Sequence, residues 1–150
     1  MTRFVTRTLI VGVALFGVIQ VVRPEKTNPP VDPAQTLQAQ FGESHPAVSV
    51  VGRACKDCHT NETSWPWYSH VAPVSWLVTH DVEEGREAVN FSSWSSYSEE
   101  QKTKLMKKLC EEVSEGEMPM STYTFLHPDA KLSATDVRAI CALGQVARLE

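Results

Sequence analysis

The pentad Cys55-Lys56-Asp57-Cys58-His59 constrains this 150-residue chain more than any other feature. C-x-x-C-H is the attachment site of a c-type haem, because two thiols at this spacing can each add across a vinyl group of one porphyrin. The histidine after the second thiol is then held beside the iron as its proximal ligand. We therefore predict one covalently bound haem c per chain, attached through Cys55 and Cys58, with His59 on the iron.

The cysteines could in principle serve two other kinds of site. A thioredoxin-like dithiol belongs to a βαβ unit, and the chain has no run of alternating apolar strand residues. A structural zinc site needs four ligands, usually as two spaced pairs, whereas Cys110 and Cys141 are isolated. Leftover cysteines in an oxidising compartment most often pair, so we expect a Cys110–Cys141 disulfide, with two buried free thiols as the alternative.

The N-terminus indicates export from the cytoplasm. Arg3 and Arg7 precede an apolar run over residues 9–22, which matches the positive leader and apolar segment of an export signal. No small-x-small cleavage site follows, so we favour an uncleaved anchor in the bacterial inner membrane over a cleaved signal for residues 1–23. Both alternatives place the rest of the chain in the periplasm.

The soluble part divides into a linker and one domain. Residues 24–33 contain four prolines and predict a semi-rigid extended linker, and residues 34–150 have the length of a single domain. Residues 24–150 carry 11 basic and 18 acidic side chains, hence a net charge of −7. This acid excess argues against nucleic acid or an anionic membrane surface as a partner and suits a basic patch on a redox protein.

The apolar residues follow helical spacing, which predicts an all-α, cytochrome c-like fold around the haem. A first helix is expected to start near residue 44 and to end near His59, and a second helix to cover residues 73–88. An aromatic loop over residues 60–68 lies between them. The expected buried face of the first helix consists of Val48, Val51, Cys55 and Cys58, and that of the second consists of Val74, Leu77, Val78 and Val82.

Two further helices are predicted from their capping residues. Ser98 and Gln101 form a capping box, and Gly116 ends the helix that it opens. Ser133 and Asp136 cap the last helix. The expected buried faces are Leu105, Met106, Leu109, Cys110 and Val113, then Val137, Ile140, Cys141 and Val146.

The second axial ligand decides what the iron does. Met118 is the favoured candidate, because it follows a helix end in the loop Gly116-Glu117-Met118-Pro119-Met120, which can fold over the open face of the haem. His80, in a predicted helix, is the main rival, and Met120 or an open position are further alternatives.

The surroundings of the haem can also be proposed from the sequence. Trp65, Trp67, Tyr68 and Trp76 are expected to be partly core and partly an aromatic wall beside the haem, with polar tips that reach its propionates. His70, Arg53 and Arg86 are other candidate propionate partners.

Short motifs run through the soluble chain: Thr27-Asn28-Pro29-Pro30, Cys55-Lys56-Asp57-Cys58-His59-Thr60-Asn61-Glu62-Thr63, Trp65-Pro66-Trp67-Tyr68, Ala72-Pro73-Val74-Ser75-Trp76, His80-Asp81-Val82, Glu84-Gly85-Arg86, Asn90-Phe91-Ser92, Gly116-Glu117-Met118-Pro119, His127-Pro128 and Ala130-Lys131-Leu132-Ser133. With them the chain resembles the bacterial haem-binding domain proteins, small c-type cytochromes with an N-terminal anchor. The resemblance covers about residues 27–144. It implies covalent haem at Cys55 and Cys58 with His59 as proximal ligand. The Glu-Met-Pro element at Met118 looks like the distal methionine loop of class I cytochromes c, and His80 also falls on a recurrent element of the family.

The function that we expect is single-electron transfer by a membrane-tethered monohaem cytochrome c on the periplasmic side. Its partners are unidentified redox proteins, and the chain itself does no bond chemistry, so we do not expect an enzyme. The alternative is a haem-based sensor or peroxidase-type haem enzyme. That function requires an open or displaceable sixth position and distal polar groups such as His80 or His70.

Overall fold

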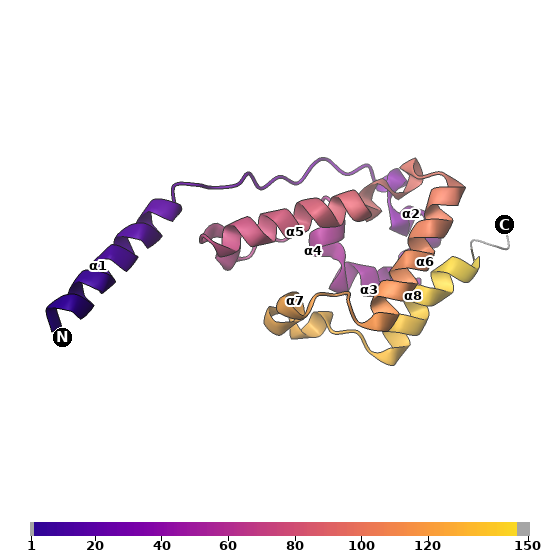
Figure 1. Ribbon diagram of the computed structural model, residues 1–150. Coiled ribbons are helices and arrows are strands. Elements are labelled where there is room, and N and C mark those ends of the chain that lie inside the picture. Colours follow the sequence, from indigo (N-terminus) through magenta and orange to yellow (C-terminus); the bar gives the residue numbers. More distant parts are fainter. Residues whose placement is uncertain (1, 147–150) are drawn as a thin grey trace.

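The computed structural model describes the backbone of residues 2–146 and the side chains of residues 2–144 (Figure 1). Over these residues the chain is 71% helical and has no strand, which confirms the predicted all-α class. In chain order the elements are α1 (Thr2–Ile19), η1 (Pro33–Gln35), α2 (Leu37–Phe41), α3 (Pro46–Ala54), α4 (Lys56–His59), η2 (Trp67–His70), α5 (Val74–Ala88), η3 (Phe91–Ser96), α6 (Glu99–Glu115), α7 (Ser121–Leu126), η4 (Pro128–Ala130) and α8 (Ala134–Val146).

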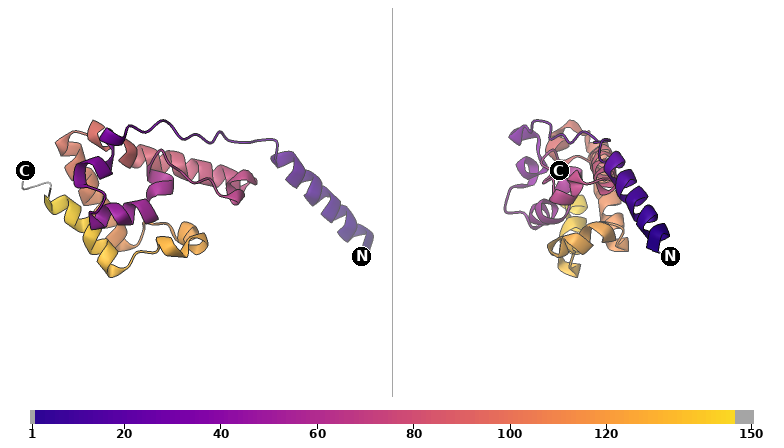
Figure 2. Two further views of the ribbon diagram at one scale, coloured as in Figure 1. Left: turned by 180° about the vertical axis from the view of Figure 1, so that it is seen from behind. Right: turned by 90° about the vertical axis from the view of Figure 1, so that its left-hand side faces the viewer.

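The N-terminal helix α1 stands apart from the helical body formed by residues 33–146, as Figure 2 shows from two further sides. Its 18 residues have a mean hydropathy of 1.6, and none of them is buried. The helix is long and apolar enough to cross a membrane, a property shared by membrane anchors and signal sequences.

The linker between α1 and the body is extended, and it lies along α5 rather than hanging free (Figure 1). The Asn28 side chain donates to the carbonyl oxygen of Thr63 at 2.9 Å. Arg86, on α5, donates to the carbonyl oxygen of Thr27 at 2.9 Å and to Oδ1 of Asn28 at 3.0 Å. The linker residues next to the body therefore have fixed partners on it.

The core of the body lies where α8 packs against α3 and α6 and where η3 packs on α2. Its two largest fully buried side chains, Phe91 and Trp94, come from η3, a short segment that the sequence did not predict. The indole Nε1 of Trp94 donates to Oε1 of Gln40 at 2.8 Å, so its polar atom is satisfied. Truncating a buried aromatic of this kind to alanine costs about 3–5 kcal/mol.

The helix ends follow the caps that the sequence predicts. Ser98 and Gln101 form the full capping box of α6, and Gly116 ends this helix with φ = 77°, in the left-handed region that favours glycine. At the start of α8 the amide of Asp136 donates to the Ser133 hydroxyl, while the amide and hydroxyl of Ser133 donate to the Asp136 carboxylate. The disulfide Cys110–Cys141 then joins α6 to α8.

The expected buried face of α5 is partly wrong. Val82 is buried, but Val74 and Leu77 are exposed, and the polar residues Ser75 and Thr79 are buried instead. The reason is that α5 packs against η2 and α4, so its contact face includes short polar side chains. The Thr79 hydroxyl is satisfied by the carbonyl oxygen of Ser75 at 2.9 Å.

The aromatic loop is not a core cluster. Trp67 is 79% exposed, and Trp76 is also exposed. The buried faces of α6 and α8 include Met106, Val113 and Ile140, as expected. The side chain of Val146, which the sequence placed on the buried face of α8, lies outside the described residues.

Candidate haem site

A cavity of about 290 Å³ opens between α4, α5, the C-terminal half of α6 and the start of α7. Its lining is largely apolar and includes Val89, Leu105, Leu109 and Val113. The predicted ligands from two distant parts of the sequence also line it: Cys55, Cys58, His59, Met118 and Met120. Folding therefore brings the pentad and the methionine loop to one apolar cavity.

A break between two helices places the thiols. α3 ends at Ala54, and Cys55, with φ = −121° and ψ = −20°, leaves the helical path before α4 begins at Lys56. The single helix expected to run from residue 44 to His59 is therefore two helices. The amide of His59 donates to the carbonyl oxygen of Cys55 at 2.9 Å, which closes the turn that holds the pentad.

Both cysteines of the pentad are free thiols in the structure. Burial, aided by the neighbouring Cys58, raises the pKa of Cys55 to about 12. Burial and the charges of Asp57 and Asp81 raise the pKa of Cys58 to about 11. A redox dithiol requires a lowered thiol pKa, so this environment is the opposite of a thioredoxin-like site.

The imidazole of His59 is oriented by backbone carbonyl groups of α5 and the residue after it. Nδ1 donates to the carbonyl oxygen of Gly85 at 2.8 Å and to that of Val89 at 3.2 Å. Since Nδ1 carries the proton, Nε2 keeps its lone pair, the form in which a histidine binds a metal. Burial holds the pKa of His59 below its ordinary value, which also favours the neutral ring.

Gly85 allows α5 to approach the pentad this closely. A Cβ at this position would lie 2.6 Å from the carbonyl oxygen of Cys58, closer than the Cβ atoms of folded proteins approach any other atom to which they are not bonded. The glycine is buried, and its own carbonyl oxygen accepts the hydrogen bond from His59. The sequence signalled this position only through the motif Glu84-Gly85-Arg86.

The loop after α6 delivers the methionines. The amides of Glu117 and Met118 both donate to the carbonyl oxygen of Glu112, at 3.0 and 3.2 Å, so the loop turns sharply after Gly116. Met118 packs against a cluster that contains Val113 and lines the cavity together with Met120.

The histidine alternative receives no support from this geometry. His80 is exposed on α5 and is not part of the cavity lining. His70 is exposed in η2, and His127 stacks on Tyr123 while its Nδ1 lies 3.1 Å from the carbonyl oxygen of that residue. Among the described residues, His59 is the histidine that lines the cavity.

Sequence reasoning missed the polar groups of the cavity. The Tyr123 hydroxyl donates to Oδ2 of Asp57 at 2.8 Å, and Oδ1 of Asp57 accepts from the amide of Ser64 at 2.9 Å. Burial and this carboxylate raise the pKa of Tyr123, which keeps the phenol protonated. Tyr123 lies in a six-residue helix without a periodic pattern, so only its contacts reveal it.

The predicted propionate partners lie elsewhere. Arg53 pairs with Asp136 at 3.0 Å, and Arg86 is bound to the linker and to Thr60 and Thr63. Lys108 is the basic residue of the described cavity lining, and it is exposed at the surface of α6.

The residues of the cavity fit a haem by their chemistry. Two free thiols, an imidazole with an available nitrogen and a thioether sulfur share one apolar space. Fold and site thus define a helical haem-binding protein. In agreement, the haem-binding domain family matches residues 14–144, and the chain belongs to this family. No curated protein and no solved structure matches the chain.

Proposed function

We propose that this haem-binding protein is a membrane-anchored monohaem c-type cytochrome that transfers single electrons on the periplasmic side of the membrane. Cys55 and Cys58 would hold the porphyrin by thioether bonds, and His59 and Met118 would bind the iron. The bound haem supplies the one-electron couple, while the protein sets orientation, solvent access and ligand strength. The chain does no bond chemistry in this proposal and is not an enzyme.

The observation that carries the proposal is the meeting of Cys55, Cys58 and His59 with the methionine loop at one cavity. The hydrogen bonds of Nδ1 to the carbonyl groups of Gly85 and Val89 fix the orientation of the His59 ring. The hydrogen bond of its own amide to the carbonyl group of Glu112 fixes the position of Met118 in its loop. Ligands fixed in this way need little rearrangement between oxidation states, which suits electron transfer. A thioether ligand raises the reduction potential relative to a second histidine.

The N-terminal helix supports the membrane location. α1 is exposed, apolar and joined to the body by a short linker, as expected for a tether. A cleaved signal sequence would leave the same domain free in the periplasm.

The first experiment is the visible absorption spectrum of the full chain, produced in a strain that attaches haem c. We expect covalent haem that resists acid–acetone extraction and a low-spin spectrum with the far-red sulfur-to-iron band. Absence of bound haem in the purified protein would refute the proposal.

Two matched substitutions then identify the sixth ligand. Met118→Ala is expected to abolish the far-red band and to open the iron to carbon monoxide. Met120→Ala, two positions away in the same loop, is expected to keep the far-red band and to leave the iron closed to carbon monoxide. If the unaltered protein is already high-spin and binds carbon monoxide, the sensor or haem-enzyme alternative replaces the electron carrier.

A further inference from the structure

The exposed large apolar side chains beyond residue 22 are concentrated in a few short stretches of the described chain. Trp67 and Phe125 are the most exposed, at 79% and 83% of their surface. Isolated exposed apolar residues are normal on protein surfaces, but a gathered set marks an interaction site. The set comprises Trp67, Val74, Trp76, Leu77, Phe125 and Leu126, and we name it the apolar tip.

Four residues of the apolar tip, from η2, α5 and α7, meet around one groove. Val74, Leu77 and Leu126 line the same groove of about 120 Å³, together with Tyr68. The ring of Trp67 packs edge-on against that of Tyr68 at 5.9 Å between centroids. The Tyr68 hydroxyl also lies 3.3 Å from Nε2 of His127, directly after α7, which ties α7 to η2.

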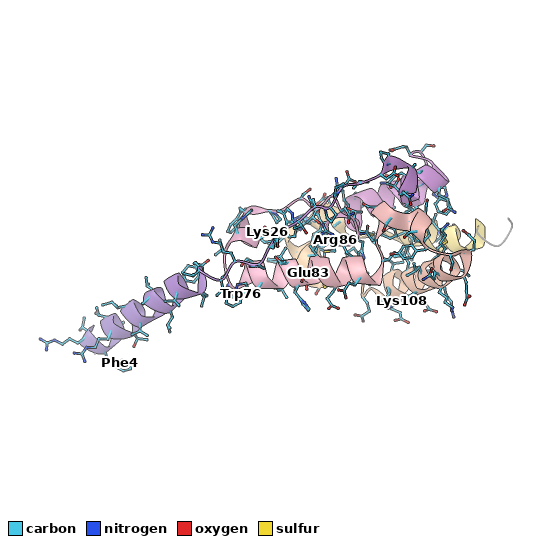
Figure 3. All side chains as sticks on the ribbon, turned by 90° about the horizontal axis from the view of Figure 1, so that it is seen from above. Phe4, Lys26, Trp76, Glu83, Arg86 and Lys108 are labelled. Atoms are coloured by element: carbon cyan, nitrogen blue, oxygen red, sulfur yellow. A yellow bond between two sulfur atoms is a disulfide. The ribbon has the colours of Figure 1, made fainter. Side chains whose placement is uncertain are left out.

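The residues directly after α1 are attached next to this same surface. The Gln20 side chain donates to the carbonyl oxygen of Ala72 at 3.1 Å and accepts from its amide at 2.9 Å. The indole Nε1 of Trp76 donates to the carbonyl oxygen of Val22 at 2.8 Å. Figure 1 shows α7 and the first turn of α5 on the side of the body toward α1, and Figure 3 shows Trp76 next to the end of α1.

We propose that the apolar tip inserts into the interface of the lipid bilayer that α1 spans. The tip lies next to the end of the apolar helix α1, and tryptophan side chains with one polar atom are the residues that favour the membrane–water boundary. The body is acidic, so insertion rests on apolar contact and not on attraction to anionic lipids. This inference rests on the retained anchor of the proposed function.

Insertion of the tip would hold the haem site next to the membrane. Cys58, Met120 and Tyr123 line both the haem cavity and the groove of the apolar tip. The cavity and the membrane-facing groove therefore share a wall. A body fixed in this way would present its haem to electron donors or acceptors at the membrane surface.

The test uses the full haem-loaded chain in phosphatidylcholine vesicles with an iodinated phenyl diazirine that partitions into hydrocarbon. After illumination, mass spectrometry locates the modified residues. We expect carbene adducts on α1, and on Trp67 and Phe125 at a level at least about tenfold above that of aromatic residues exposed to water.

The matched control is Ser95→Phe, which places an exposed phenylalanine in η3, on the side of the body where α2 lies and away from α1. This residue should stay unmodified. If α1 carries adducts but the apolar tip carries no more than the phenylalanine of Ser95→Phe, the proposal is overturned. A protein partner would then remain as the occupant of the tip. Equal modification of Phe125 and of the phenylalanine of Ser95→Phe would also overturn the proposal. The absorption spectrum of the same sample reports separately whether haem is bound.

Discussion

At the scale of single residues, the site depends on how closely two backbones approach. Gly85 brings α5 against the carbonyl group of Cys58, and its own carbonyl oxygen receives the Nδ1 proton of His59. One residue therefore determines both the packing of α5 on α4 and the orientation of the imidazole. A side chain at this position cannot be added without moving one of these elements.

We therefore expect Gly85→Ala to destabilise the protein by about 1–3 kcal/mol, because overpacking forces the helices apart. The added Cβ meets backbone atoms, which cannot turn aside as a flexible side chain can. The displacement would also weaken the hydrogen bonds of His59, so the yield of attached haem should fall. Guanidinium unfolding followed by circular dichroism measures the first effect, and the haem absorbance measures the second.

Gly52→Ala is the matched control within α3. A Cβ at Gly52 has no neighbour within 4 Å, so alanine should stabilise this helix by about 0.5–1 kcal/mol. Equal stability of Gly85→Ala and the unaltered protein would show that α5 does not approach Cys58 as closely as described.

The pentad and the methionine loop were predictable because their chemistry is written in consecutive residues. Tyr123 and the role of Gly85 were not, since each acts through a contact with a residue more than 25 positions away. Arg53 and Arg86 are expected as propionate partners for their charge alone, and the backbone acceptors that they have in the fold could not be foreseen from the sequence.

At the scale of elements, the helix caps connect the sequence to stability. Asp136 accepts from the amide and hydroxyl of Ser133 and pairs with Arg53 across to α3. The Ser133 amide, the Ser133 hydroxyl and Arg53 lower the pKa of this carboxyl below its ordinary value. Because the unfolded chain takes up this proton first, the stabilisation is present above about pH 4 and is lost as the pH falls further.

Asp136→Asn should therefore cost about 1 kcal/mol at neutral pH, the difference between a charged and a neutral acceptor. The cost should shrink as the pH falls below about 4, because the carboxyl of the folded protein then becomes protonated as well. Urea unfolding at several pH values measures both. Asp129→Asn is the control, because within the described chain its side chain has no hydrogen-bond partner. A cost independent of pH would mean that the charge of Asp136 contributes nothing.

The disulfide between α6 and α8 closes a loop of 31 residues. Joint replacement by Cys110→Ala and Cys141→Ala should lower the free energy of unfolding by about 3–4 kcal/mol, the loop entropy regained by the unfolded chain. Adding a thiol reductant should destabilise the unaltered protein by a similar amount and leave the double variant unchanged. A reductant that affects both proteins equally would contradict this origin of the stability.

Local signals explain which elements could be predicted. The capping boxes at Ser98 and Ser133 lie within four consecutive residues, so α6 and α8 were predicted with their starts. η3 has six residues and no period, yet it supplies Phe91 and Trp94 to the core. The exposure of Val74 and Leu77 was hidden for another reason, because apolar spacing does not tell a core face from a surface that contacts lipid or a partner.

At the scale of the whole molecule, the linker determines how the body is held relative to α1. Arg86 is the central contact, because its guanidinium group donates to Thr60, Thr27, Asn28 and Thr63 at 2.8–3.0 Å. It thus binds the linker, α5 and the loop after the pentad together. Figure 3 shows Arg86 on the side of the body along which the linker passes with Lys26.

Loosening of the linker should follow from Arg86→Lys, because an ammonium group cannot reach four acceptors arranged around a planar fork. Hydrogen bonds to a charged donor contribute about 1.5–3 kcal/mol, so the linker should detach at least about tenfold more often. Trypsin cleaves after Lys26, and the rate at which the full chain in vesicles is cut there, followed by gel electrophoresis, measures this opening. Arg138→Lys is matched to it, since Arg138 donates only to Thr135 among the described residues, and both substitutions keep the number of tryptic sites. Equal cleavage rates of the two variants would show that Arg86 does not hold the linker, and that the apolar tip alone would have to orient the body.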